Sequence, residues 1–123
     1  MRYLTDRKRA IGMGSAKSGT EHFWSMKISS VALLILIPLF VFTFGSILGS
    51  DYVTVTTYFG RPWPALIAGL TIVVSMMHFK DGVQTLIEDY VQGTAQKVTL
   101  LVMICASYGI AAIGLFAVAR LAL

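Results

Sequence analysis

Three long stretches of the chain carry no charged residue, and polar segments separate them. They cover residues 28–50, 62–79 and 98–119. A helix that crosses about 30 Å of hydrocarbon needs roughly 20 predominantly apolar residues, with about 17 as the lower end. Because a backbone in lipid must satisfy its own hydrogen bonds, such stretches form helices there. The pattern predicts an all-α membrane protein with three transmembrane helices.

The polar segments set the expected bounds of the elements. Residues 1–27 form a polar N-terminal arm, and residues 28–123 form the three-helix transmembrane domain. The first helix is expected over residues 27–49 and the third over 98–119. The second begins near Pro64, because proline suits a first turn, and continues in a more polar form to about Tyr90, with Gly93 as its stop.

Composition agrees with a membrane protein, since 56% of the residues are hydrophobic, 13% are charged and the mean hydropathy is +0.75. The isoelectric point near 9.5 reflects a local excess of positive charge rather than a nucleic-acid site. The basic residues before the first span are Arg2, Arg7, Lys8, Arg9, Lys17 and Lys27, against the acidic Asp6 and Glu21. Positive charge beside a first span predicts a cytoplasmic N-terminus and, after three crossings, a periplasmic Leu123. The expected partner is the lipid membrane, with no nucleic acid.

The second helix carries the most informative pattern. Its small and polar residues recur at steps of four and three, which places them on one helical face. They are Thr71, Ser75, His78, Gly82, Thr85 and Asp89. Such a stripe without a histidine would indicate close helix packing.

His78 adds a second interpretation, because ionisable residues inside a span usually face a bundle interior or a functional site. A neutral imidazole is a good haem-iron ligand, and Gly82 lies one turn further along the same face. The alternative is a structural histidine bonded to a neighbouring helix. His22, the other histidine, lies in the arm and is poorly placed to face His78. A second axial histidine would therefore come from another chain, either a second copy or a different subunit.

Two residues near the end of the second helix suit a quinone. Asp89 and Tyr90 lie eleven and twelve positions after His78, or about 18 Å along the axis for Tyr90. A tyrosine hydroxyl can donate to a quinone carbonyl, and a neighbouring carboxylate can orient it or supply protons. The alternative is an interfacial anchor with solvated end-of-helix charges.

These features together resemble the small hydrophobic membrane-anchor subunit of succinate dehydrogenase. The resemblance rests on the glycine-rich segment 12–24, Lys27 with Ser29 and Ser30, and the interval from His78 to the Asp89–Tyr90 pair. It covers nearly the whole chain. Lys27 stands where related sequences often have Arg, which binds carboxylates as a bidentate fork rather than as a point charge.

The resemblance implies specific roles for these residues. His78 is expected to be an axial iron ligand of a haem b shared with a larger cytochrome b subunit. Tyr90 is expected to bind ubiquinone with Asp89 behind it, and Lys27 to lie near a haem propionate or the quinone pocket. The other implied partners are the flavoprotein and iron–sulfur subunits, at a bacterial inner membrane.

The predicted function is therefore that of a non-catalytic anchor subunit of a succinate:ubiquinone oxidoreductase. The anchor of a fumarate reductase, which runs the reverse reaction, is an alternative that the sequence leaves open. Another is a cofactor-free membrane scaffold or assembly protein, in which His78 only packs helices. A reduced-minus-oxidised optical spectrum of the complex separates a haem carrier from a scaffold.

Overall fold

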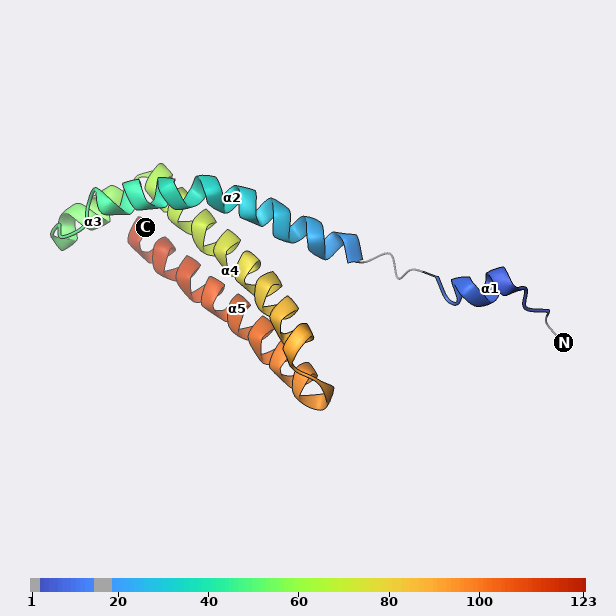
Figure 1. Cartoon of the computed structure of the whole chain (residues 1–123). Helices are drawn as coiled ribbons and strands as arrows, with labels where there is room; N and C mark the ends of the chain where they lie inside the picture. The colour runs from blue at the N-terminus through green and yellow to red at the C-terminus, as the bar shows by residue number, and fades with distance from the viewer. Residues whose placement is uncertain (1–2, 15–18) are drawn as a thin grey trace.

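The part of the chain that the structure describes folds into three long helices and two short ones (Figure 1). The computed structural model describes residues 3–14 and 19–123. The helices are α1 (Asp6–Ile11), α2 (Gly19–Gly45), α3 (Tyr52–Phe59), α4 (Pro62–Tyr90) and α5 (Gly93–Ala122), and no strand occurs in the described ranges. The helices α2, α4 and α5 are each long and apolar enough to cross a membrane. The predicted all-α fold with three spans is confirmed.

Helix α4 is central, because it packs against both α2 and α5. In Figure 1, α4 and α5 run side by side in opposite directions. The contact between α2 and α4 includes His78 and Asp81 in the second half of α4. The α4–α5 contact is close at Gly114, where an added Cβ would lie 3.0 Å from Cγ2 of Ile72. Glycine at this position therefore allows the two helices to approach each other.

The first long helix begins at Gly19 and includes residues that the sequence pattern had assigned to the arm. The prediction placed its start at Lys27, where the apolar run begins. The edge of the hydrocarbon and the end of a helix are different boundaries, however, because a helix can extend into the polar headgroup region. Glu21 in the first turn also suits the positive end of the helix dipole. Residues 1–2 and 15–18 of the predicted arm lie outside the described part of the chain.

The loop after the first span contains the additional helix α3. Its threonine and valine residues have only moderate helix propensity, so local sequence gave little sign of it. Packing supports it, since Phe59 at its end is buried in a cluster with Ile47 and Ala68. Asp51 precedes the helix in an extended conformation and accepts a 2.5 Å hydrogen bond from the Thr54 hydroxyl.

The connection between α4 and α5 also differs from the prediction. Gly93 was expected to stop the second helix, but α4 already ends at Tyr90 and Gly93 is the first residue of α5. Its φ of +69° is a left-handed conformation that glycine adopts without steric cost. Gly93 therefore lies at the tight connection between the two helices, but it begins α5 and does not end α4.

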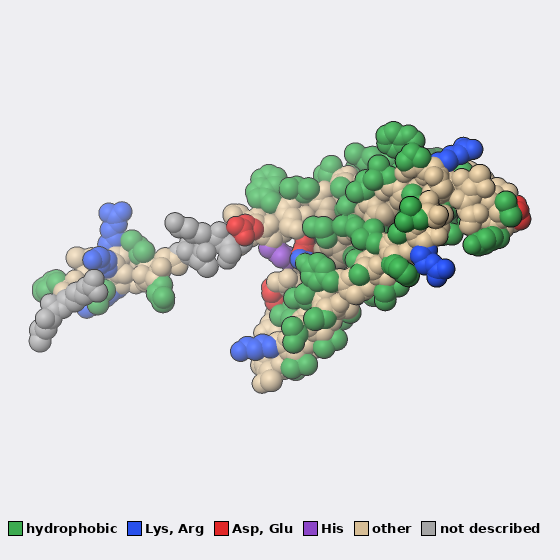
Figure 2. Space-filling view, turned by 180° about the vertical axis from the view of Figure 1, so that it is seen from behind, with side chains coloured by type: hydrophobic (Ala, Val, Ile, Leu, Met, Phe, Trp, Pro, Cys, Tyr) green, Lys and Arg blue, Asp and Glu red, His purple; other side chains and the backbone are tan. Residues whose placement is uncertain are grey.

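Most apolar side chains of the long helices point outward (Figure 2). Only 6% of the most apolar part of α5 is buried within the chain. Large exposed side chains include Leu34, Phe42, Ile113 and Phe116. This surface would be unfavourable in water and suits contact with lipid tails or with other membrane helices.

Candidate functional site

His78 lies at the edge of an apolar groove between α2 and α4. The groove has a volume of about 510 Å³, and its lining is Ser30, Leu33, Leu34, Ile37, Pro38 and His78. All of these except His78 come from α2. The groove is open on one side, so a bound molecule would also contact another subunit or lipid. An imidazole beside an apolar surface suits a flat, hydrophobic cofactor that needs a nitrogen ligand.

The imidazole of His78 is held by α2. Its Nδ1 lies 3.0 Å from Oγ of Ser29, which is only 6% exposed. The Ser29 hydroxyl also lies 2.8 Å from the carbonyl oxygen of Ser25 and 3.0 Å from that of Met26. These contacts connect the histidine of α4 to the backbone of α2.

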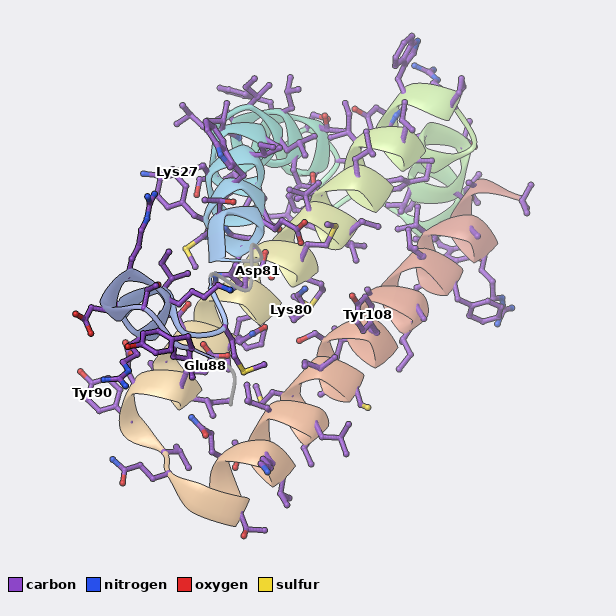
Figure 3. The ribbon with its side chains drawn as sticks, turned by 90° about the vertical axis from the view of Figure 1, so that its right-hand side faces the viewer. Lys27, Lys80, Asp81, Glu88, Tyr90 and Tyr108 are labelled. Carbon is purple, nitrogen blue, oxygen red and sulfur yellow. The ribbon has the colours of Figure 1, made fainter. Side chains whose placement is uncertain are left out.

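A second polar contact joins the same two helices one turn further along. The Ser25 hydroxyl donates to Oδ2 of Asp81 at 2.6 Å, and Nζ of Lys80 lies 2.9 Å from Oδ1. Asp81 is 2% exposed, the largest side chain fully buried in the described ranges. Figure 3 shows Lys80 and Asp81 on the middle part of α4, beside α2. The cation balances a carboxylate that would be costly alone in an apolar surrounding.

The sequence pattern does not single out Asp81, because the stripe of small and polar residues steps four positions from His78 to Gly82. Asp81 is three positions from His78, and this spacing also brings two residues to neighbouring places on a helix face. The available signal was an acidic residue directly after a lysine at the end of an uncharged run.

The rest of the stripe has mainly local contacts. The hydroxyls of Thr71 and Thr85 donate to the carbonyl oxygens of Ile67 and Asp81, each four residues earlier in α4. Gly82 has open space where a side chain would begin, with no atom within 4 Å of an added Cβ. The stripe is therefore partly buried against α2 and partly open.

Asp89 and Tyr90 lie at the C-terminal end of α4 and are both exposed, Tyr90 by 83%. Figure 3 shows Tyr90 near Glu88, well along α4 from the Lys80–Asp81 pair. Glu88 accepts a bond from Gln84, and its carbonyl oxygen accepts one from Gln96 of α5. Within the described ranges, no hydrogen bond joins Asp89 to Tyr90. The side chains of Asp89 and Tyr90 are therefore open to solvent, lipid or a neighbouring subunit.

Lys27 and His22 both lie in the first turns of α2. Lys27 is exposed, and its Nζ is 5.5 Å from the ring centroid of Phe23, a cation–π contact. Nε2 of His22 is buried without a hydrogen-bond partner among the residues that the structure describes. Neither residue contacts the His78 imidazole directly through a hydrogen bond in these ranges.

The fold and the site define a multi-pass membrane protein in which one histidine borders an apolar groove. The model of the succinate dehydrogenase/fumarate reductase transmembrane subunit family matches residues 1–116. The chain belongs to this family. The resemblance predicted from the sequence is therefore confirmed. Anchor subunits of this enzyme are non-catalytic, which agrees with the expectation that the chain is not an enzyme by itself.

Two curated relatives carry the same description. The chain is 42% identical to the succinate dehydrogenase hydrophobic membrane anchor subunit of Paracoccus denitrificans, over all of this chain and 95% of the relative. It is 27% identical to the protein of that description from Rickettsia conorii, over 78% of this chain and 77% of the relative. No solved structure matches the chain.

Proposed function

We propose that this chain anchors succinate dehydrogenase to the bacterial inner membrane and supplies one axial ligand of a haem b together with part of the ubiquinone site. Its partners are the flavoprotein and iron–sulfur subunits on the cytoplasmic side and a larger cytochrome b subunit in the membrane. Support comes from the three spans, the family, and relatives that are named as anchors of this enzyme. The outward apolar faces of α2 and α5 provide area for a second membrane subunit.

The observation that carries the haem proposal is the position of His78 beside the apolar groove of α2. The donor set fits the group, because a neutral imidazole ligates haem iron and the aliphatic lining suits a porphyrin face. Gly82 leaves open space on the same face of α4. A bound haem b would accept and return single electrons. This chain would contribute one nitrogen and one apolar wall, and the larger subunit would contribute the rest.

Replacement of His78 tests the haem proposal. The His78→Leu complex should show a changed b-type spectrum and a changed haem midpoint potential, because the iron loses a nitrogen ligand. His22→Leu is the matched control, since it makes the same replacement at the other histidine and should leave both properties unchanged. An unaltered spectrum and potential in His78→Leu would exclude direct ligation. A complex that lacks any b-type haem before mutation would favour the cofactor-free scaffold.

The ubiquinone proposal concerns the cytoplasmic end of α4. Tyr90 is exposed within this chain, which suits a residue that completes a pocket with a neighbouring subunit. Reduction of a quinone builds negative charge on its oxygens, and a preorganised hydroxyl donor stabilises that charge. Asp89 would orient the hydroxyl or pass protons towards it. Lys27 would lie near a haem propionate or the quinone pocket, and it is one helical turn from Ser30 of the groove.

Removal of one hydroxyl tests this assignment. Tyr90→Phe should lower ubiquinone reduction while succinate oxidation with an artificial acceptor at the flavoprotein persists. Tyr108→Phe removes the same atom from an exposed tyrosine of α5 and should leave both rates unchanged. Equal quinone kinetics in Tyr90→Phe and the parent complex would reduce Tyr90 to an interfacial anchor.

A further inference from the structure

We infer that Ser29 is a positioning residue for the iron-ligating histidine: its hydroxyl oxygen accepts the Nδ1–H of His78 and leaves Nε2 free for iron. The inference rests on the proposed haem ligation by His78. It assigns the ligating nitrogen and identifies a residue on a different helix that controls it. In the sequence, Ser29 stands out only as part of a small polar segment at the start of the first span.

The direction of the Ser29–His78 hydrogen bond follows from the other contacts of the serine. A serine hydroxyl has one proton to donate and lone pairs that accept. The carbonyl oxygens of Ser25 and Met26 can only accept, and they lie 2.8 Å and 3.0 Å from Ser29 Oγ. The hydroxyl proton is therefore directed at the backbone, and the bond to His78 needs its proton from the ring. Nδ1 carries that proton, so the lone pair of the neutral imidazole is on Nε2.

Burial and register make this arrangement specific. Ser29 is 6% exposed, so water does not compete well for its oxygen. The bond from Ser25 to Asp81 lies one turn away on both helices, with spacings of four residues on α2 and three on α4. Two such bonds fix the axial register of α2 relative to α4. The orientation of the imidazole is thus determined before iron binds, as partners of metal-ligating histidines commonly achieve.

A measurable property of the haem depends on this bond. An acceptor on Nδ1–H raises the electron density of the imidazole and makes it a more basic ligand. A more basic ligand favours the ferric over the ferrous state. Loss of the acceptor should therefore raise the haem midpoint potential. Only the difference in strength of this bond between ferric and ferrous haem changes the potential, so the shift in the reduction equilibrium is bounded by the contribution of one whole hydrogen bond, up to about tenfold.

The test compares buried serines in the assembled complex by optical redox titration. Ser29→Ala should favour ferrous haem by up to about tenfold, an upward shift of at most about 59 mV for a one-electron couple. Ser107→Ala is the matched control, because Ser107 is also buried and bonds a carbonyl oxygen four residues earlier, at 2.8 Å, but on α5. Ser29→Thr retains the hydroxyl and should restore the native potential.

The remaining outcomes also decide the question. If Ser29→Ala fails to assemble, the nearly isosteric Ser29→Cys replaces the acceptor by a weaker sulfur and should shift the potential in the same direction. An unchanged potential in the assembled Ser29 variants, with a changed spectrum in His78→Leu, overturns the role of Ser29 alone. An unchanged spectrum in His78→Leu overturns the haem ligation itself, and with it this inference.

Discussion

Lys80 and Asp81 are neighbours in sequence whose charged groups lie 2.9 Å apart inside the helical bundle. Asp81 is nineteen positions after Pro62, about 28 Å along α4, which places the pair towards the far end of a hydrocarbon layer about 30 Å thick, on the side that the basic N-terminal residues predict to be cytoplasmic. A buried pair need not stabilise a fold relative to apolar residues. Removal of one partner is costly, however, because it leaves the other charge without compensation.

This asymmetry predicts how variants of the pair behave. Lys80→Met should destabilise the complex by roughly 3–5 kcal/mol, because the Asp81 carboxylate remains buried. The double variant Lys80→Met/Asp81→Asn should recover most of the loss. Thermal unfolding of the detergent-solubilised complex measures both. Arg9→Met, which breaks the exposed 4.0 Å pair with Asp6, is the control and should have little effect. A double variant no more stable than Lys80→Met would contradict the charge argument.

Lys27 allows a separate test of the interfacial cation. If it lies near a haem propionate or the quinone pocket, Lys27→Met should change the haem potential or the quinone kinetics, whereas Lys27→Arg should change them less. Lys97 is an exposed lysine near the start of α5, on the same predicted side of the membrane. If Lys27→Met and Lys97→Met behave alike, Lys27 contacts only lipid phosphates.

Sequence reasoning found some of these residues for identifiable reasons. His78 was recognisable because an ionisable group inside an uncharged run is unusual, and the Asp89–Tyr90 pair because of its interval from His78. Ser25 and Ser29 could not be matched to their partners. Their contacts to Asp81 and His78 span 56 and 49 residues, and the relative register of α2 and α4 is set by packing in three dimensions.

At the scale of elements, the close approach of α4 and α5 depends on glycine. A Cβ on Gly114 would lie 3.0 Å from a side-chain carbon of Ile72, whereas a Cβ on Gly109 would meet no atom within 4 Å. Gly114→Leu should therefore destabilise the helix pair by about 1–3 kcal/mol through overpacking. Gly109→Leu carries the same gain in helix propensity without the contact. Similar melting temperatures for the two variants would mean that the helices separate easily.

The spans were predictable because length and apolarity impose strong constraints in lipid. The ends of the helices were less predictable from the sequence than the spans. Gly19 begins α2 within a polar segment, and α3 forms where Phe59 can be buried against Ile47 and Ala68. Hydropathy reports the surroundings of a residue, while the extent of a helix also depends on tertiary packing.

At the scale of the whole molecule, the orientation in the membrane decides which partners each end of α4 can reach. The basic residues before the first span predict a cytoplasmic N-terminus. With three crossings, the α4–α5 connection and Tyr90 are then cytoplasmic, and α3 and Leu123 are periplasmic. Of the two possible orientations, only this one brings Tyr90 to the side where the proposed succinate-oxidising subunits lie.

Cysteine labelling tests the orientation directly, because Cys105 is the chain's one cysteine and can be removed as Cys105→Ser. In that background, Tyr3→Cys and Leu123→Cys each place a thiol at an exposed terminal position without changing any charged side chain. A membrane-impermeant maleimide should label Leu123→Cys in intact spheroplasts and Tyr3→Cys only after the inner membrane is opened. The reverse pattern would put Tyr90 on the periplasmic side and separate it from the proposed electron supply. Labelling of both thiols in intact spheroplasts would require an even number of crossings and would contradict the three-span topology.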